Sequence, residues 1–217
     1  MITHIHEQRS PEWHAARAGV ITASMFSTAR YRTKKGEWSA DARKYAFCLA
    51  IERLGGSPLD DGMETAAMRR GTELEPAARK RLSQILGKPI EIPGFITTDD
   101  KRFGASADGF IDDDGGCEIK CLVDAGRIHS VLIENDLSDF MDQIQGCMWV
   151  TDRSWWDFCV YLPQLQAAKR DIYRKRVFRD NAYILQMVTD LHEFDKYVEH
   201  QMAGLRNHLP VYSDEPF

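Results

Sequence analysis

The chain has 217 residues, of which 43% are hydrophobic and 28% charged, and its formal net charge is −5. This composition excludes a disordered chain, and no apolar run approaches the roughly 18 to 20 residues needed to cross a bilayer. We expect a cytoplasmic protein with no membrane segment, because the first residues also lack the basic and apolar regions of a signal peptide. The acidic balance argues against indiscriminate binding to nucleic acid, since phosphate contacts need Lys and Arg, but it is compatible with a locally basic surface.

Helix signals dominate the first part of the chain. The segment Ser10-Pro11-Glu12-Trp13 predicts a helix start, with Ser as N-cap and Pro at the first helical position, and Gly19 ends this helix. Thr22-Ala23-Ser24 predicts a second short helix, preceded by a buried β-like link. The basic stretch over residues 30–36 is expected to form a mobile loop. Two longer helices are predicted next, over residues 39–54 and 64–86.

Strands become frequent in the remainder of the chain. The predicted strands cover residues 90–98, 103–111, 117–122, 154–162 and 172–178. A helix over residues 140–150 separates the third strand from the fourth, and Asp180 caps a final helix that runs to about residue 209. We therefore predict a single α/β domain over residues 1–217, with a mixed central sheet flanked by helices and a C-terminal helix from about residue 180.

The hairpin predicted from the strands over residues 103–111 and 117–122 is the most informative feature of the chain. These strands flank Asp112-Asp113-Asp114-Gly115-Gly116, a composition that favours a turn. A turn centred on Asp113 places Asp108 opposite Glu118, where cross-strand Cβ atoms are about 5 Å apart. Because strand side chains alternate between faces, Glu118 and Lys120 point to the same side, about 6 to 7 Å apart. The hairpin therefore predicts two carboxylates and an ammonium group in one small space.

This cluster of charges has two interpretations. Carboxylates held so close repel each other unless one is protonated or a cation lies between them, and Mg²⁺ prefers such oxygen ligands. Alternatively, the segment is a solvated hairpin whose Asp, Glu and Lys form exposed ion pairs, each contributing roughly 0 to 1 kcal/mol. On the opposite face of the strand, Cys117, Ile119 and Cys121 are expected to pack inward. The hairpin alone leaves both interpretations open.

Three further segments combine with the hairpin into one ordered pattern. In chain order, the four are Trp13-His14-Ala15-Ala16-Arg17-Ala18-Gly19-Val20-Ile21-Thr22-Ala23-Ser24, Arg70-Gly71-Thr72-Glu73-Leu74-Glu75, the hairpin from Ser106 to Lys120, and Asp142-Gln143-Ile144-Gln145-Gly146-Cys147-Met148-Trp149-Val150-Thr151. This pattern resembles the phage lambda-type exonucleases of the viral recombinase (YqaJ-like) family, within the PD-(D/E)xK nuclease superfamily. The chain has Ser-Ala-Asp-Gly where family members often have Ser-Pro-Asp-Gly, but the functional Asp is present.

The resemblance implies a fold and an activity. The fold is a restriction-endonuclease-like core. The activity is that of a Mg²⁺-dependent 5′ to 3′ double-strand DNA exonuclease, which releases mononucleotides and leaves a 3′ single strand for phage-type recombination by single-strand annealing. A RecB-like or restriction-like nuclease, cutting single strands or internally, is the alternative enzyme. A non-catalytic DNA-binding module is the alternative of another class, although such a module has no reason to keep like charges together.

The resemblance also assigns a metal centre. Asp108 and Glu118 would hold the ion, joined by the backbone carbonyl of Ile119, and Glu75 would approach directly or through water. Mg²⁺ is the expected cofactor, with Mn²⁺ as a substitute and one or two ions per site. Glu75 has an ordinary alternative role, because the first part of a helix commonly carries Glu to complement the helix dipole.

Two further catalytic residues follow from the family pattern. Lys120 would orient or deprotonate the attacking water, and Gln143 would lie beside the metal centre and the phosphate. Gln143 could instead be a satisfied polar residue at the boundary of the core. We prefer Gln143 to Gln145, because helical geometry points Gln145 elsewhere.

Arg17, Ser24 and Ser106 match family positions that bind the terminal 5′-phosphate of duplex DNA. A guanidinium fork and hydroxyl donors suit this task. The alternative interpretation is structural, with Ser24 capping or lining a helix and Arg17 paired with Glu12 or Glu7.

The remaining expectations concern DNA and partners. Arg30, Arg32, Lys34 and Lys35 are candidates for a DNA channel, because lambda-type exonucleases assemble as ring-shaped trimers around DNA. The resemblance therefore implies a homotrimeric ring, a phage single-strand annealing protein as partner, and a phage or prophage protein in the bacterial cytoplasm.

Overall fold

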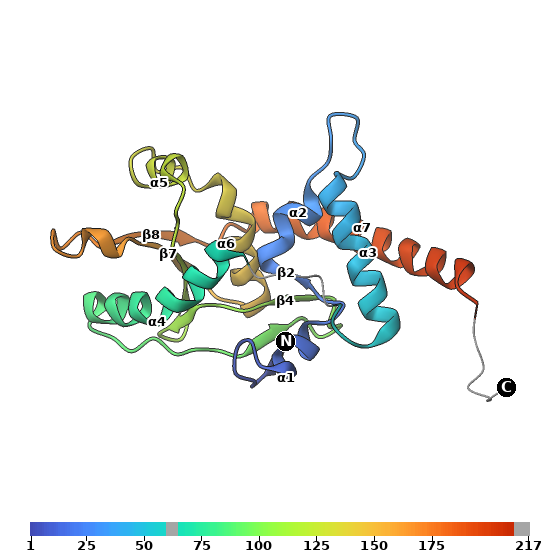
Figure 1. Cartoon of the computed structure of the whole chain (residues 1–217), viewed down its shortest axis with the longest axis horizontal. Helices are drawn as coiled ribbons and strands as arrows, with labels where there is room; N and C mark the ends of the chain where they lie inside the picture. The colour runs from blue at the N-terminus through green and yellow to red at the C-terminus, as the bar shows by residue number, and fades with distance from the viewer. Residues whose placement is uncertain (60–64, 211–217) are drawn as a thin grey trace.

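The structure is a computed structural model that describes residues 1–59 and 65–210. These residues form two four-stranded mixed sheets with helices packed on them (Figure 1). The strand order is β1-β3-β4-β2 in the first sheet and β5-β6-β7-β8 in the second. Each sheet contains one parallel pair, β2 with β4 and β6 with β7. The strands are β1 Ile2–His4, β2 Ile21–Thr22, β3 Phe95–Thr97, β4 Phe103–Ala105, β5 Gly109–Ile111, β6 Gly115–Lys120, β7 Trp155–Tyr161 and β8 Ile172–Phe178.

The helices agree in position with most of the predicted ones. They are α1 Pro11–Arg17, α2 Phe26–Arg30, α3 Ala40–Gly55, α4 Ala66–Leu86, α5 Ala125–Leu132, α6 Ser138–Thr151 and α7 Asn181–His208, with short 3-10 turns at Ala23–Met25 and Pro163–Leu165. Long α7 packs along α3 on the opposite side of the molecule from α4 (Figure 1). Within the described residues, no helix is long and apolar enough to span a bilayer.

Capping side chains fix several helix starts. Ser10, Ser39 and Asp180 each accept a hydrogen bond from a backbone N–H two or three residues further along, which satisfies a donor that the first turn leaves free. Thr65 does the same for α4. The predicted start of this helix at Glu64 lies outside the described residues. The predicted helix boundaries are thus confirmed where a capping residue marks them.

The predicted strand over residues 103–111 is broken, and its halves belong to different sheets, β4 in the first and β5 in the second. Side chains replace the backbone ladder between them. Gln8 Nε2 donates to the carbonyl of Ala107 at 3.1 Å, and the N–H of Ile119 donates to Asp108 Oδ2 at 2.6 Å. Residues 106–108 therefore cross from one sheet to the other, and Asp108 directly precedes β5.

Three other predictions need correction. The strand over residues 90–98 is shorter, because Pro93 donates no ladder bond. At Gly94 the backbone passes so close to the carbonyl oxygen of His4 that a Cβ would lie 1.9 Å from it, which only glycine avoids. Arg30 belongs to α2 and not to a loop. Helix α5 was not predicted, although Asp124 caps it by accepting a hydrogen bond from the backbone N–H three residues on.

The hydrophobic core has two parts, one on each face of the second sheet. Adjacent residues of β7 point into different parts: Trp156 is fully buried in the main cluster with residues of α2, α3, α6 and α7, and Trp155 lies in the smaller one beneath α4. In β6, Cys117 and Ile119 also face α4. The alternate residues Glu118 and Lys120 are thereby turned toward α6, the face on which a site is predicted.

Candidate active site

The hairpin of β5 and β6 positions the predicted carboxylates. Its register pairs Gly109 with Cys117 and Ile111 with Gly115, which confirms a turn centred on Asp113. Extending this register by one residue places Asp108 opposite Glu118. The two residues lie on the edge of one cavity of about 140 Å³.

Glu118, Lys120 and Gln143 form a closed triangle of polar contacts. Lys120 Nζ lies 2.7 Å from Glu118 Oε1, and Gln143 Nε2 donates to the same oxygen at 2.7 Å. Lys120 Nζ also donates to Gln143 Oε1 at 2.9 Å. Glu118 Oε1 is therefore fully engaged. The buried Gln145 points the other way, toward the N-terminus of α7, where it binds the backbone of Phe178 and Asp180.

Asp108 is destabilised as an anion in this environment. Burial raises the pKa of its carboxyl group well above the ordinary value, and the charges of Glu118 and Glu75 raise it further. Lys120 and the backbone N–H of Ile119 oppose the shift without cancelling it. The site therefore favours either a proton or a cation next to Asp108.

The donor set fits a hard divalent cation. Glu118 is 4% exposed, and its second oxygen, Oε2, is buried without a hydrogen-bond partner among the described residues. Over residues 1–59 and 65–210, no three His, Cys, Asp or Glu side chains converge on one point. Mg²⁺ needs no such protein cage, because it binds through one or two carboxylates and keeps several waters. Asp108 and Glu118 would be these two carboxylates, and the contribution of the Ile119 carbonyl likewise stays a prediction.

Lys120 is held as an ammonium group. Burial lowers the pKa of Lys120, but the charges of Glu118 and Asp108 outweigh this effect and raise it overall. A protonated Lys120 can donate hydrogen bonds to a water or a phosphate oxygen. It cannot accept a proton until a neighbouring cation lowers its pKa.

Glu75 lies at the same cavity but is already paired. Arg79, four residues later on α4, forms an ion pair with Glu75, and Arg79 Nε donates to the backbone carbonyl of Asp108 at 2.7 Å. Arg9 binds the other side of Glu75 at 3.3 Å. The sequence interpretation missed both arginines. The spacing of four residues between Glu75 and Arg79 could have indicated the first, since such residues are neighbours on a helix, whereas nothing local indicates Arg9.

The predicted phosphate-binding residues converge on this cavity from separate elements. Arg17 donates to Ser106 Oγ at 3.0 Å, and its guanidinium lies 4.1 Å from the ring centroid of Trp13. Burial lowers the pKa of Arg17 to about 10, so the group stays charged at neutral pH. No carboxylate of the described residues forms an ion pair with Arg17, contrary to the alternative that pairs it with an N-terminal Glu. The cavity is lined by Gln8, Arg9, Trp13, Arg17, Thr22, Ala23, Ser24, Glu75, Ser106, Asp108, Glu118 and Gln143.

The candidate channel residues divide into two groups. Arg30 is paired with Asp142 and Asp190, and Arg32 is paired with Glu193 of α7. Their charges are largely compensated within the chain. Lys34 and Lys35 are exposed, so a role in a DNA channel stays a prediction that these two lysines can fulfil most directly.

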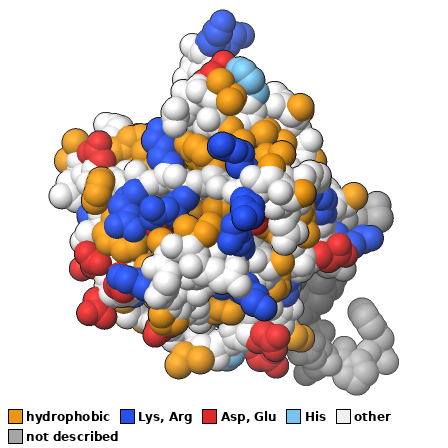
Figure 2. All heavy atoms as spheres, turned by 90° about the vertical axis from the view of Figure 1, so that its left-hand side faces the viewer, with side chains coloured by type: hydrophobic (Ala, Val, Ile, Leu, Met, Phe, Trp, Pro, Cys, Tyr) orange, Lys and Arg blue, Asp and Glu red, His pale blue; other side chains and the backbone are white. Residues whose placement is uncertain are grey.

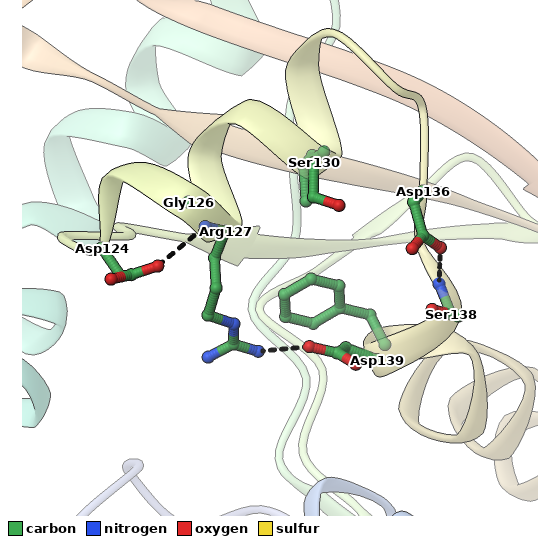
Figure 3. Close-up of a pocket in the computed structure, with 9 residues that line it drawn as sticks. Asp124, Gly126, Arg127, Ser130, Asp136, Ser138 and Asp139 are labelled. Atoms are coloured by element: carbon green, nitrogen blue, oxygen red, sulfur yellow. Dashed lines mark hydrogen bonds and ion pairs between the residues drawn. The ribbon is translucent and has the colours of Figure 1, made fainter.

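A second cavity, of about 320 Å³, lies between α5 and the start of α6 (Figure 3). Its acidic side chains are already engaged: Asp124 accepts from the backbone N–H of Arg127, Asp136 accepts from the N–H of Ser138, and Asp139 pairs with Arg127. An acidic lining of this kind repels a phosphate backbone. None of the predicted site residues lies there.

The charge of the chain is unevenly distributed over its surface. On the face that includes α5, the β7–β8 connection and the end of α4, Lys and Arg side chains lie across the middle and most Asp and Glu side chains lie nearer the margin (Figure 2). A net charge of −5 therefore coexists with locally basic surface.

The comparisons with known proteins agree with this geometry. The chain matches the YqaJ-like viral recombinase domain over residues 12–154. It is similar to the alkaline exonuclease LHK-Exo from Laribacter hongkongensis, with 33% identity, coverage of 91% of this chain and 97% of that chain, and a TM-score of 0.78. The same enzyme in complex with dAMP gives 33% identity, the same coverage and a TM-score of 0.79.

A more distant structure shares the fold. The phage related exonuclease from Haemophilus somnus 129PT has 17% identity and a TM-score of 0.66, with coverage of 86% of this chain and 96% of that chain. No curated protein matches the chain. The match with the alkaline exonuclease confirms the predicted fold class of a mixed α/β, restriction-endonuclease-like core. With a family match over residues 12–154 and a 33% identical structure of nearly the same length, the chain belongs to the YqaJ-like viral recombinase domain family.

Proposed function

We propose that this protein is a Mg²⁺-dependent 5′ to 3′ double-strand DNA exonuclease, which releases mononucleotides and leaves a 3′ single strand for recombination by single-strand annealing. One observation carries the proposal: Arg17, Ser24 and Ser106 line the same cavity of about 140 Å³ as Asp108 and Glu118. A terminal phosphate bound by the first set lies within reach of hydrolytic chemistry at the second. Cleavage is then confined to the end of a strand. The similarity to an alkaline exonuclease supports the same conclusion.

Asp108 and Glu118, with the carbonyl of Ile119, would hold one or two Mg²⁺ ions, for which Mn²⁺ substitutes. When bound, the ion supplies charge stabilisation at the scissile phosphate and acidifies a water. The buried and unpartnered Oε2 of Glu118 supports this role. Glu75, which lines the same cavity, would reach the ion directly or through water once an arginine partner is displaced.

Lys120 and Gln143 prepare the carboxylate and the attacking water. Both bind Glu118 Oε1, which leaves Oε2 as the free ligand atom. Two of the three donors of the Lys120 ammonium bind Glu118 and Gln143, and the third can hold the water in line with the phosphate. Because its pKa is raised by Glu118 and Asp108, orientation of the water is the role that the residue can perform without first losing its proton.

Arg17 would select the DNA end. Its guanidinium already donates to Ser106 Oγ, and both groups can donate to a terminal phosphate. Packing on Trp13 holds the guanidinium in place before DNA binds. A 5′-hydroxyl end lacks the anion that this arrangement recognises, so phosphorylated ends should be preferred.

The wider assembly rests on the family membership. We propose a homotrimeric ring around duplex DNA with Lys34 and Lys35, together with Arg30 and Arg32, near its channel. A phage-type single-strand annealing protein would receive the 3′ strand, in the bacterial cytoplasm.

The test is digestion of linear duplexes with 5′-phosphate or 5′-hydroxyl ends, beside a closed circle, in Mg²⁺ or chelator, by the wild type and Asp108→Ala. We expect Mg²⁺-dependent loss of the phosphorylated linear DNA alone, absent in the variant. Cutting of the circle would support an internally cleaving nuclease instead. Binding without cleavage of any substrate would support a DNA-binding module.

A further inference from the structure

Two arginines from distant parts of the chain hold Glu75. Arg79 pairs with Glu75 Oε1 and also donates from Nε to the backbone carbonyl of Asp108 at 2.7 Å. Arg9, in the segment between β1 and α1, pairs with Glu75 Oε2 at 3.3 Å. Each carboxylate oxygen of Glu75 thus has its own guanidinium partner at the edge of the predicted metal site.

Arg79 and Arg9 do not hold Glu75 equally tightly. The side chain of Arg79 is 13% exposed and is fixed at two points, whereas that of Arg9 is 47% exposed and reaches Glu75 through one longer contact. A half-exposed ion pair is weak, because water and salt screen it. A competing anion can therefore remove Arg9 from Glu75 while Arg79 stays in place.

Arg9 also lies where such an anion can reach it. Gln8, Arg9 and Glu75 line both the catalytic cavity and a neighbouring cavity of about 350 Å³ between the N-terminal segment and α4. The turn that carries Arg9 is fixed, since Arg9 adopts a φ of 72°, Gln8 binds the carbonyl of Ala107, and Ser10 caps α1. Apolar side chains that line the neighbouring cavity, including Ile92 and Pro93, suit the ribose or base of a nucleotide.

We propose that Arg9 binds a backbone phosphate of the DNA strand and thereby releases Glu75 Oε2 toward the cation site. This inference rests on the proposed nuclease function. The exchange replaces one charge-assisted hydrogen bond of Arg9 by another, so its cost is small. Glu75 remains attached to Arg79 through Oε1, and its other oxygen becomes available to an ion or to an ion-bound water. Binding of DNA and binding of the cation then favour each other, as linkage requires.

The first measurement is the salt dependence of DNA binding by Arg9→Gln in chelator, followed by fluorescence anisotropy of a 5′-phosphorylated duplex. Loss of one phosphate contact should lower the slope of log affinity against log salt by about 0.7 to 0.9. Arg102→Gln is the matched control. The side chain of Arg102 is also partly exposed (39%) and paired with carboxylates, but these carboxylates belong to α7 and lie away from the cavity. Its slope should equal that of the wild type.

The second measurement is Mn²⁺ binding to the DNA-free protein by calorimetry. Arg9→Gln should bind Mn²⁺ about two- to fivefold more tightly than the wild type, because Glu75 Oε2 has lost its competitor. In the Glu75→Gln background, the Arg9→Gln change should leave Mn²⁺ affinity unaltered. A merely structural role of Arg9 would weaken both ligands together, whereas exchange weakens DNA binding and strengthens ion binding.

The proposal is overturned if Arg9→Gln keeps the wild-type salt slope, or if its Mn²⁺ affinity is unchanged or lower. It is also overturned if the wild type binds no DNA in chelator, because the proposed contact of Arg9 with a phosphate does not need the ion. Failure of the nuclease function would look different, with no Mg²⁺-dependent cleavage by the wild type. A cooperative thermal unfolding transition of Arg9→Gln and of Arg102→Gln in chelator verifies that both variants are folded.

Discussion

Gln143 Nε2 donates to Glu118 Oε1 at 2.7 Å, joining the middle of α6 to the second half of strand β6. The same Gln143 accepts from Lys120 at 2.9 Å. One amide thus orients the carboxylate that we propose as a metal ligand and the ammonium beside it. Removal of such supporting contacts typically costs about 10- to 100-fold in metal affinity or activity, since a misdirected carboxylate binds its ion poorly.

Gln143→Ala should lower kcat about 10- to 100-fold without unfolding the protein, because Glu118 loses its orientation. The rate of digestion under saturating DNA measures the effect. Gln145→Ala is the control in the same helix. It removes the bonds to Phe178 and Asp180 and should lower the melting temperature while leaving kcat at 25 °C intact. Equal rates for Gln143→Ala and the wild type would remove Gln143 from the site.

Asp108→Asn should stabilise the protein in chelator. Burial and two nearby carboxylates raise the pKa of Asp108, so its charge costs free energy that a neutral amide avoids. A gain of about 1 kcal/mol corresponds to about 2 to 4 °C in melting temperature for a chain of this size. The same variant should lose the stabilisation that Mg²⁺ gives to the wild type. Thermal unfolding with and without Mg²⁺ checks both expectations, and a lower melting temperature in chelator would contradict the first.

Arg17→Ala should abolish the preference for 5′-phosphorylated ends. Hydrogen bonds to charged groups contribute about 1.5 to 3 kcal/mol, so the ratio of rates on phosphate and hydroxyl ends should fall about 10-fold or more. Arg17→Lys keeps the charge but not the fork and should restore only part of the ratio. Slowing by the same factor on both ends would place the phosphate site elsewhere.

The ion pair of Arg102 and Glu199 should contribute to stability only above acidic pH. The hydrogen bond from Arg102 lowers the pKa of Glu199, so the folded state holds this proton less tightly than the unfolded state. Its contribution is present above the unfolded pKa of about 4.3 and is lost as pH falls through the lower folded value. Because Glu199 is 42% exposed, the contribution is at most about 1 kcal/mol. Urea unfolding of the wild type and Arg102→Gln should show a larger difference at pH 7 than at pH 3, and an equal difference at both pH values would contradict the expectation.

Local rules predicted the hairpin correctly. The three Asp residues between β5 and β6 form the turn, the two Gly residues predicted to belong to it instead begin β6, and the resulting register brings Asp108 to Glu118. Alternation along β6 then placed Lys120 with Glu118, and helical spacing distinguished Gln143 from Gln145. Each of these steps depends on residues within a few positions of one another, which is the range over which backbone geometry is fixed by sequence.

Long-range packing could not be predicted in the same way. The division into two sheets depends on Gln8 and Asp108 replacing ladder hydrogen bonds at residues 106–108. Arg30 was expected in a loop, but Asp142 and Asp190 from two later helices bind it. Arg9 reaches Glu75 across 66 positions of the chain. Partners at such separations leave no periodic signal in the sequence around either residue.

The crossing between the two sheets has a consequence for the size of the product. Ser106, in the proposed phosphate site, and Asp108, in the proposed metal site, are joined through the single residue Ala107, which is 1% exposed and packed in the main core. Two residues of backbone span at most about 7 Å. In the proposed enzyme, the anchored strand end and the bond to be cut are thus held at a separation that covalent geometry limits. This short fixed backbone spacing between the two proposed sites favours removal of a unit of constant size in each cycle.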